Sequence, residues 1–217
     1  MTKEQNNSQA PEALLLLGTH CAHCPAMLNS LAELVKQGVL SKLEAINLEQ
    51  RPEVAQQLGV RSVPWVRIGP FELTGQRSLA ELRQWAQKSA SADGIRGYIE
   101  AMLAEGEMDR VLAMLARDAG VMVRVIELLE DGNARINVRL GIGVIMEEYE
   151  GQPLLQEYIP QLGRLTQHTD PRVRGDACHY LALSHSRDAR IFIAPLLNDE
   201  NADVREVAGE SLLALDD

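Results

Sequence analysis

The sequence predicts an α/β domain followed by an all-α domain. Three observations support this fold class: strand-like and helix-like patterns alternate over residues 12–90, only helical patterns follow, and the charge composition changes near residue 90. The chain has 217 residues, of which 46% are hydrophobic, and this is enough for two small cores.

Charge marks the expected domain boundary. Residues 1–90 hold 8 acidic and 9 basic side chains, whereas the remainder holds 23 acidic and 12 basic ones, and no lysine follows Lys88. The polar stretch 88–94 is typical of a connector. We therefore expect a disordered N-terminus at 1–11, an α/β domain at 12–90 and a helical domain at 91–217.

Residue spacing predicts the elements of the first domain. The uncharged run 13–17 suits a buried strand, and apolar residues after Cys24 recur at helical intervals. Ser78 is a typical helix cap. In order, we expect a strand at 13–17, a helix from Cys24, a strand at 42–48, a helix at 52–58, strands at 63–68 and 71–74, and a helix after Ser78.

Cys21 and Cys24 lie at the predicted turn between the first strand and the first helix. Unpaired backbone N–H groups and the positive end of the helix dipole favour a thiolate there, and the thiolate is the nucleophile. The pair therefore predicts a dithiol/disulfide redox site.

Composition also limits the function classes. The acidic second half disfavours nucleic acid, since binding to phosphates depends on clustered Lys and Arg. No run of about 18 apolar residues occurs, and residues 1–10 lack the apolar core of a signal peptide, so we expect a cytoplasmic protein without membrane contact. In that reducing compartment a close cysteine pair is catalytic or metal-binding more often than structural.

Four features together indicate a family resemblance. They are the order of elements, the Cys-x-x-Cys after the first strand, Val63-Pro64 before the third strand and Gly75 before the last helix. Over residues 12–90 the chain resembles the thioredoxin superfamily in its short, glutaredoxin-like form. The resemblance implies a cis Val63–Pro64 bond that faces the cysteine pair. It also implies that Trp65 belongs to the core and that no bound organic cofactor is needed, because the electrons travel through the cysteines.

The resemblance assigns roles to the site residues. Cys21 is expected to be the attacking thiolate and Cys24 the buried resolving thiol. Clients are expected to bind along Val63 and Pro64, with Thr19 and Gly75 nearby. One departure concerns the buried acid that many thioredoxins carry six residues before the first cysteine, since this position is Leu15 here.

His23 precedes the second cysteine, as in disulfide isomerases and periplasmic thiol oxidases. A histidine near Cys21 can stabilise the thiolate and make the disulfide easier to reduce. We therefore expect a reduction potential less negative than about −270 mV, the value typical of thioredoxin. The alternative is that His23 is a solvated side chain without influence on the thiol.

A metal-transfer module is the main rival for the first domain. Residues 18–24 also resemble the copper-binding loop of heavy-metal-associated domains, and two thiolates beside imidazoles suit soft cations or zinc. Those domains lack the Val63-Pro64 feature, and Thr19 stands where they carry methionine.

Helices are expected throughout the second domain, at 94–104, 108–118, 121–130, 134–148, 153–166, 172–183, 189–197 and 202–215. The helices at 172–183 and 202–215 repeat one sequence pattern at a period of 31 residues. In order, the residues Val173, Arg174, Ala177 and Leu181 match Val204, Arg205, Ala208 and Leu212. Helical units that repeat at this length stack into an α-solenoid. The pattern resembles HEAT repeats, over 133–217 and more loosely over 93–132.

A helical stack of this kind offers a surface to another protein, and its acidity favours a basic partner. The alternative is that it only extends the core. Cys178 is expected to be a packed helix residue, and no metal site is expected there, because no nearby ligand spacing fits one. The sequence thus predicts a thiol-disulfide oxidoreductase with a protein-docking domain; a soft-metal carrier and a non-catalytic adaptor are the alternatives.

Overall fold

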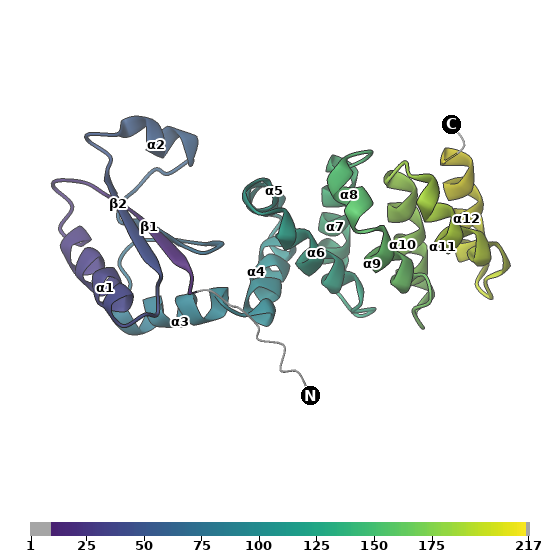
Figure 1. Ribbon diagram of the computed structural model, residues 1–217, viewed down its shortest axis with the longest axis horizontal. Helices are drawn as coiled ribbons and strands as arrows, with labels where there is room; N and C mark the ends of the chain where they lie inside the picture. The colour runs from purple at the N-terminus through teal and green to yellow at the C-terminus, as the bar shows by residue number, and fades with distance from the viewer. Residues whose placement is uncertain (1–9, 216–217) are drawn as a thin grey trace. The chain divides into compact units, whose positions relative to one another are not determined.

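The computed structural model describes residues 10–215, which form two compact units (Figure 1). The first unit ends at Ile95 and the second begins at Arg96. Apart from Ala10 and Pro11, the N-terminal segment for which disorder is expected lies outside the described residues.

The first unit is an α/β sandwich around a four-stranded sheet. Its strands are β1 (Glu12–Leu17), β2 (Lys42–Asn47), β3 (Trp65–Ile68) and β4 (Phe71–Thr74). They lie in the order β2-β1-β3-β4, in which β1 and β2 are parallel and the other neighbours are antiparallel. The predicted α/β class and element order are confirmed. Helix α1 (Cys24–Lys36) follows β1, α2 (Pro52–Gln57) follows β2, and α3 (Leu79–Ser89) follows β4.

Helices α1 and α3 share one apolar core with the sheet. On α1, Met27, Leu31 and Leu34 recur at helical spacing and are fully buried. The helix ends at Lys36, and Gly38, just after the C-cap residue Gln37, has a φ of 70°, the left-handed conformation that glycine adopts without a steric penalty. This packing fixes α1 against β1, and with it the turn that carries both cysteines.

The stretch expected to be a polar connector is mostly helical. Helix α3 runs to Ser89, and α4 (Ala92–Ala104) begins three residues later. Ser91 caps α4, because its hydroxyl accepts a hydrogen bond from the Gly94 N–H at 3.0 Å. The small polar residues here therefore end one helix and begin the next.

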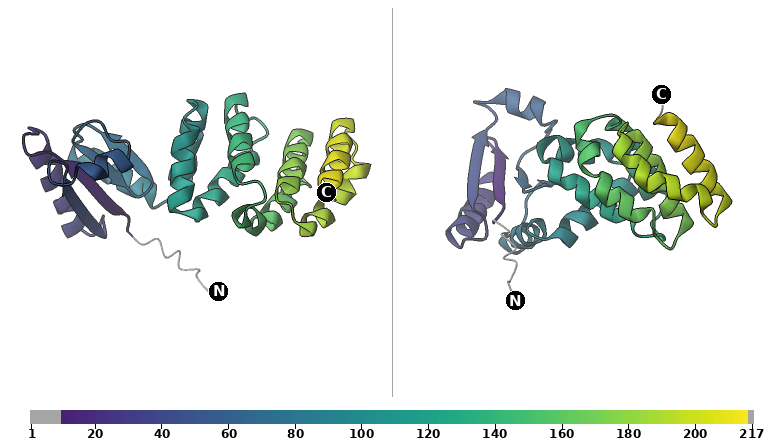
Figure 2. Two further views of the ribbon diagram at one scale, coloured as in Figure 1. Left: turned by 90° about the horizontal axis from the view of Figure 1, so that it is seen from above. Right: turned by 45° about the vertical axis from the view of Figure 1, so that its right-hand side comes forward.

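The second unit is all-helical, and the predicted helical-repeat architecture is confirmed. Figure 2 shows three of its long helices side by side, α7 (Ile136–Glu148), α10 (Pro171–Leu183) and α12 (Ala202–Ala214). After α4, the elements are α5 (Met108–Arg117), the 3₁₀ turn η1 (Ala119–Val121), α6 (Met122–Leu129), α7 (Ile136–Glu148), α8 (Pro153–Glu157), α9 (Ile159–Leu165), α10 (Pro171–Leu183), η2 (Arg187–Ala189), α11 (Arg190–Ile193), η3 (Ala194–Asn198) and α12 (Ala202–Ala214).

Two predicted helices are broken. The segment predicted as one helix at 153–166 is split at Tyr158, and the one at 189–197 is a short α-helix between two 3₁₀ turns. Proline explains both breaks. Pro160 and Pro195 lack the N–H that a continuous helix needs, and the proline ring clashes with the carbonyl four residues earlier.

The 31-residue repeat is visible in the contacts as well as in the sequence. Asp170 and Asn201 cap α10 and α12 at equivalent positions. Arg174 donates to the His168 and Thr169 carbonyls at 2.9 and 3.1 Å. Arg205 makes the same pair of bonds to the carbonyls of Asp199 and Glu200, at 2.7 and 3.1 Å. The repeated arginine therefore ties each helix to the loop that precedes it.

Candidate functional site

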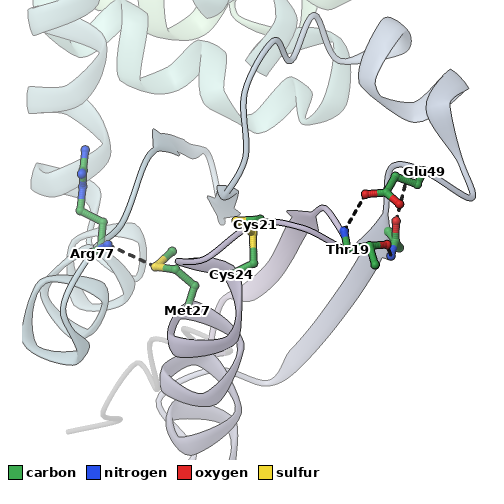
Figure 3. The surroundings of a disulfide bond; sticks show 7 residues. Thr19, Cys21, Cys24, Met27, Glu49 and Arg77 are labelled. Carbon is green, nitrogen blue, oxygen red and sulfur yellow. Dashed lines mark hydrogen bonds between the residues drawn. A yellow bond between two sulfur atoms is a disulfide. The ribbon is translucent and has the colours of Figure 1, made fainter.

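Cys21 and Cys24 form a disulfide at the turn between β1 and α1, with their Cα atoms 5.4 Å apart (Figure 3). The Cys21 N–H donates to the Gly18 carbonyl and the Cys24 N–H to the Cys21 carbonyl, both at 3.3 Å. Cys24 is 3% exposed, whereas Cys21 is half-buried. The two sulfurs thus differ in accessibility, and Cys21 is the one that a second protein can reach more easily.

The disulfide lies at the N-terminus of α1. Cys24 is the first residue of the helix, His23 is its cap residue without a side-chain cap bond, and the first turn contains no acidic side chain. No carboxylate in this turn therefore competes for the positive end of the helix dipole. An anion on either sulfur is favoured by this position. His23 is exposed beside it.

The Val63–Pro64 peptide bond is cis, as predicted from the family resemblance. Pro64 is buried, and its carbonyl accepts the Gly75 N–H at 2.9 Å. Gly75 has a φ of 84°. A Cβ atom added to Gly18 would lie 3.4 Å from Val63 Cγ2 and 4.0 Å from Cys21 Cβ. The fold therefore brings Val63 to the cysteine turn, and Gly75 to Pro64.

Thr19 is tied to the end of β2. Its N–H donates to Glu49 Oε1 at 2.8 Å, and its hydroxyl oxygen accepts from Asn47 Nδ2 at 3.1 Å (Figure 3). Asn47 in turn accepts the Glu49 N–H at 2.9 Å. Hydrogen bonding from Thr19, from its side chain first and then from its backbone N–H, holds the pKa of Glu49 below its ordinary value. Glu49 is therefore an anion beside the cysteine turn at neutral pH.

The sequence did not point to Asn47 or Glu49. The signal that could have found them is the parallel pairing of β1 and β2, in which Leu17 lies opposite Asn47. The carboxyl ends of both strands therefore meet at one edge of the sheet. Polar residues just after β2 then lie beside the turn that follows β1.

A further contact connects α1 to the segment before α3. The Arg77 N–H donates to the sulfur of Met27 at 3.2 Å (Figure 3). Met27 is fully buried one turn after Cys24. Ser78, next to Arg77, caps α3 in a capping box with Glu81, as its sequence position predicts. This segment is thus fixed at both ends.

Leu15 and Trp65 are both core residues. Leu15 is fully buried, and Trp65 is 5% exposed, as expected. On the sheet Leu15 lies opposite Val66, inside the apolar cluster. The position at which many thioredoxins carry a buried acid is thus a hydrocarbon contact in this protein.

The third cysteine lies far along the chain in α10. Cys178 is fully buried with a free thiol, as its place in the repeat predicts. Burial raises the pKa of this thiol above its ordinary value. Within residues 10–215, no group of three or more His, Cys, Asp and Glu side chains is arranged to hold a metal ion.

Comparison with protein families assigns each unit. A family model for the thioredoxin domain matches residues 13–87, and one for HEAT repeats matches residues 122–213. The first unit is thioredoxin-like and the second carries HEAT repeats. A search of curated proteins found no match to the chain.

The thioredoxin match spans β1 to α3 and so includes both cysteines and Val63–Pro64. The HEAT match begins at α6, earlier than the start of the clear sequence repeat at residue 133. In the thioredoxin-like unit and in the HEAT repeats, none of the described helices is long and apolar enough to span a membrane.

Proposed function

We propose that this protein is a thiol-disulfide oxidoreductase whose HEAT repeats bind a protein partner. The observation that carries the proposal is the linked pair of an accessible Cys21 and a buried Cys24 at a helix N-terminus, in a thioredoxin-like unit. A cytoplasmic location is part of the proposal and rests on the composition of the sequence.

The exchange proceeds in two balanced steps. The Cys21 thiolate attacks one sulfur of a client disulfide, forms a mixed disulfide and releases the other client sulfur as a thiolate. The Cys24 thiol then loses its proton and attacks Cys21 Sγ, which forms the Cys21–Cys24 disulfide and releases the second client thiolate. Two electrons pass from the dithiol to the client, and the reverse sequence oxidises a client dithiol.

The remaining site residues take supporting roles in this proposal. Val63 borders the cysteine turn and, with the cis-bonded Pro64, offers the edge along which a client strand lies, while the Gly75 N–H holds the Pro64 carbonyl. Thr19 fixes the entry to the turn, since its own N–H is bonded to Glu49. No bound organic cofactor takes part.

The test uses cysteine variants of the full chain. In a Cys178→Ser background, Cys24→Ser should accumulate mixed disulfides with a disulfide-bearing test protein such as insulin, because the resolving thiol is missing. Cys21→Ser is the matched control and should accumulate none. Absence of trapping together with stoichiometric Cu(I) or Zn(II) binding would favour the metal carrier, which His20 and His23 beside the pair support; absence of both would favour an adaptor.

His23 is proposed to stabilise the Cys21 thiolate. Replacing it by alanine should make the reduction potential more negative by about 20 mV, because 30 mV corresponds to about 1.4 kcal/mol and a hydrogen bond to the thiolate worth about 1 kcal/mol is lost. The measurement is a titration against glutathione, with His179→Ala in the HEAT unit as control. An unchanged potential would mean that His23 is only a solvated side chain.

A further inference from the structure

We propose that a groove between α10 and α12 binds a positively charged, extended segment of the client protein; this deepens, and rests on, the exchange function proposed above. The groove has a volume of about 640 Å³. Its walls extend from Pro171 to Leu183 on α10 and from Asp203 to Ala214 on α12. At a rise of 1.5 Å per residue this is a length of about 17 Å, enough for a short peptide.

The α12 wall alternates acidic and small apolar side chains. Asp203, Val207, Glu210 and Ala214 follow one another at intervals of four, three and four residues, so they share one face of the helix. Asp203, Glu210 and Ala214 are exposed, and Val207 is half-buried. On the opposite wall, a Cβ added to Gly175 would meet nothing within 4 Å, so the mouth of the groove is open.

Both arginines and His185 at the groove already have partners. Arg139 forms an ion pair with Asp176, Arg172 pairs with Asp170 at 2.7 Å, and His185 lies 2.8 Å from Glu150. In contrast, Asp203 and Glu210 form no ion pair with any residue in the described part of the chain. The charges that remain available to a ligand are therefore negative.

Helix α7 carries an exposed apolar ridge, and Leu140 in this ridge directly follows Arg139 in the sequence. Ile136, Leu140 and Val144 are 71%, 64% and 44% exposed and follow one another at intervals of four residues. The adjacent Arg139 lines the groove and joins α7 to α10 through Asp176. A partner that covers both features presents basic side chains to α12 and apolar ones to α7.

Charge favours a basic client over a second copy of this chain as the occupant. The chain has a net charge of −10, so two copies repel each other. Asp203 and Glu210 are seven residues apart on a helix, about 10.5 Å along its axis. An extended chain in the polyproline II conformation rises about 3.1 Å per residue with three residues per turn, so Lys or Arg side chains three residues apart lie on one side of it, about 9 Å apart, and match both carboxylates.

The experiment measures fluorescence anisotropy of labelled, cysteine-free decapeptides with the full-length protein. One peptide carries Lys at two positions three residues apart among Leu and Ser, and the other carries Glu at those positions. We expect the Lys peptide to bind, and to bind more weakly as salt is raised, because screening weakens charge pairing. The Glu peptide should not bind measurably.

Variants locate the binding surface. Asp203→Asn combined with Glu210→Gln should weaken binding of the Lys peptide about tenfold, and Leu140→Ser about threefold. Glu147→Gln combined with Glu148→Gln removes the same charge from the end of α7 and should change the affinity less than twofold. All replaced side chains are exposed, and circular dichroism checks that each variant is folded.

Three results would overturn the proposal: equal binding of both peptides, an unchanged affinity in the Asp203→Asn, Glu210→Gln variant, or self-association that this variant abolishes, which would make a second copy the occupant. The probe contains no sulfur, so its binding does not depend on thiol exchange. Failure of the exchange function would instead appear in the Cys24→Ser trapping experiment, so the failure of one proposal can be told apart from the failure of the other.

Discussion

Two opposing electrostatic influences surround the disulfide. The N-terminus of α1 favours an anion on the cysteine sulfurs, whereas the Glu49 carboxylate disfavours one. Glu49 Oε1 and Cys21 Cβ lie 3.7 and 4.0 Å from the position that a Gly18 Cβ would take. Their separation is therefore at most about 8 Å, within the range of an incompletely screened interaction. The reactivity of Cys21 depends on the balance between the two.

Replacing Glu49 by glutamine should shift that balance. The amide oxygen can still accept the Thr19 N–H, so the turn keeps its anchor while the charge is lost. We expect the pH midpoint of Cys21 alkylation to fall by about 0.3 units, because one nearby negative charge is removed. The measurement is the iodoacetamide rate across pH on the reduced Cys178→Ser protein.

Glu33→Gln is the matched control for this experiment. Glu33 also carries a lowered pKa, chiefly through a hydrogen bond from Gln37, but it lies nine residues along α1 from Cys24, about 13 Å away along the axis. It should leave the midpoint unchanged. If both variants give the wild-type midpoint, Glu49 acts only as an anchor for the turn.

Site residues could be predicted from the sequence where they belong to one short local motif. The cysteine pair lies within four positions of sequence, and the cis Val63–Pro64 bond followed from the family resemblance. Asn47 and Glu49 were not predictable in this way. Their contact with Thr19 depends on the parallel register of β1 and β2, which brings together residues 28 and 30 positions apart.

The buried ion pair between Arg174 and Asp199 joins two successive repeats at the scale of elements. Arg174 Nε and Nη2 each donate to one carboxylate oxygen at 2.7 Å, and the two side chains are 8% and 7% exposed. We expect Asp199→Asn to lower the free energy of unfolding of the HEAT unit by about 3 kcal/mol, since it leaves a buried cation without its partner. Chemical denaturation followed by circular dichroism measures this.

Glu200→Gln provides the control for the ion pair. Glu200 lies 3.5 Å from Arg174 but is 87% exposed, so its loss should cost less than about 0.5 kcal/mol. The hydrogen bonds from Arg174 hold the pKa of Asp199 below its ordinary 3.8. Because the folded-state pKa is lowered, the stabilisation is present above pH 3.8 and is lost as the pH falls through the lowered pKa. Asp199→Asn should abolish this part of the acid dependence.

We expect replacement of two helical glycines by alanine to change the stability of the HEAT unit in opposite directions. A Cβ on Gly163 of α9 would lie 2.5 Å from the Phe192 ring, so Gly163→Ala should destabilise the HEAT unit by about 2 kcal/mol through overpacking. A Cβ on Gly209 of α12 would meet nothing within 4 Å, so Gly209→Ala should stabilise it by about 0.5 kcal/mol through helix propensity. Equal effects of the two variants in thermal melts would contradict the close approach of α9 to Phe192.

Periodicity predicted which elements exist better than where they break. The α10 and α12 helices were predictable because their caps, Asp170 and Asn201, and their apolar spacing agree. The breaks at Tyr158 and before Pro195 were missed, because apolar residues continue at helical spacing across both prolines. A missing N–H outweighs that spacing.

At the scale of the whole molecule, net charge, tryptophans and tyrosines are distributed unequally between the two units. Residues 1–90 are almost neutral, whereas the remainder carries the negative charge. Both tryptophans, Trp65 and Trp85, belong to the thioredoxin-like unit, and all four tyrosines belong to the HEAT unit. Tryptophan fluorescence therefore reports on the first unit alone, while far-ultraviolet circular dichroism is dominated by the helices of the second.

Each unit holds its own apolar core, so each should unfold in its own transition. Leu31 in α1 and Leu162 in α9 are fully buried in different units. We expect Leu31→Ala to lower the unfolding free energy seen by tryptophan fluorescence by about 3 kcal/mol, through the lost contacts and the remaining cavity. Leu162→Ala should lower the value seen by circular dichroism by a similar amount. If either variant moved both transitions equally, the two cores would form one cooperative unit, and the separation of exchange from docking would lose its structural basis.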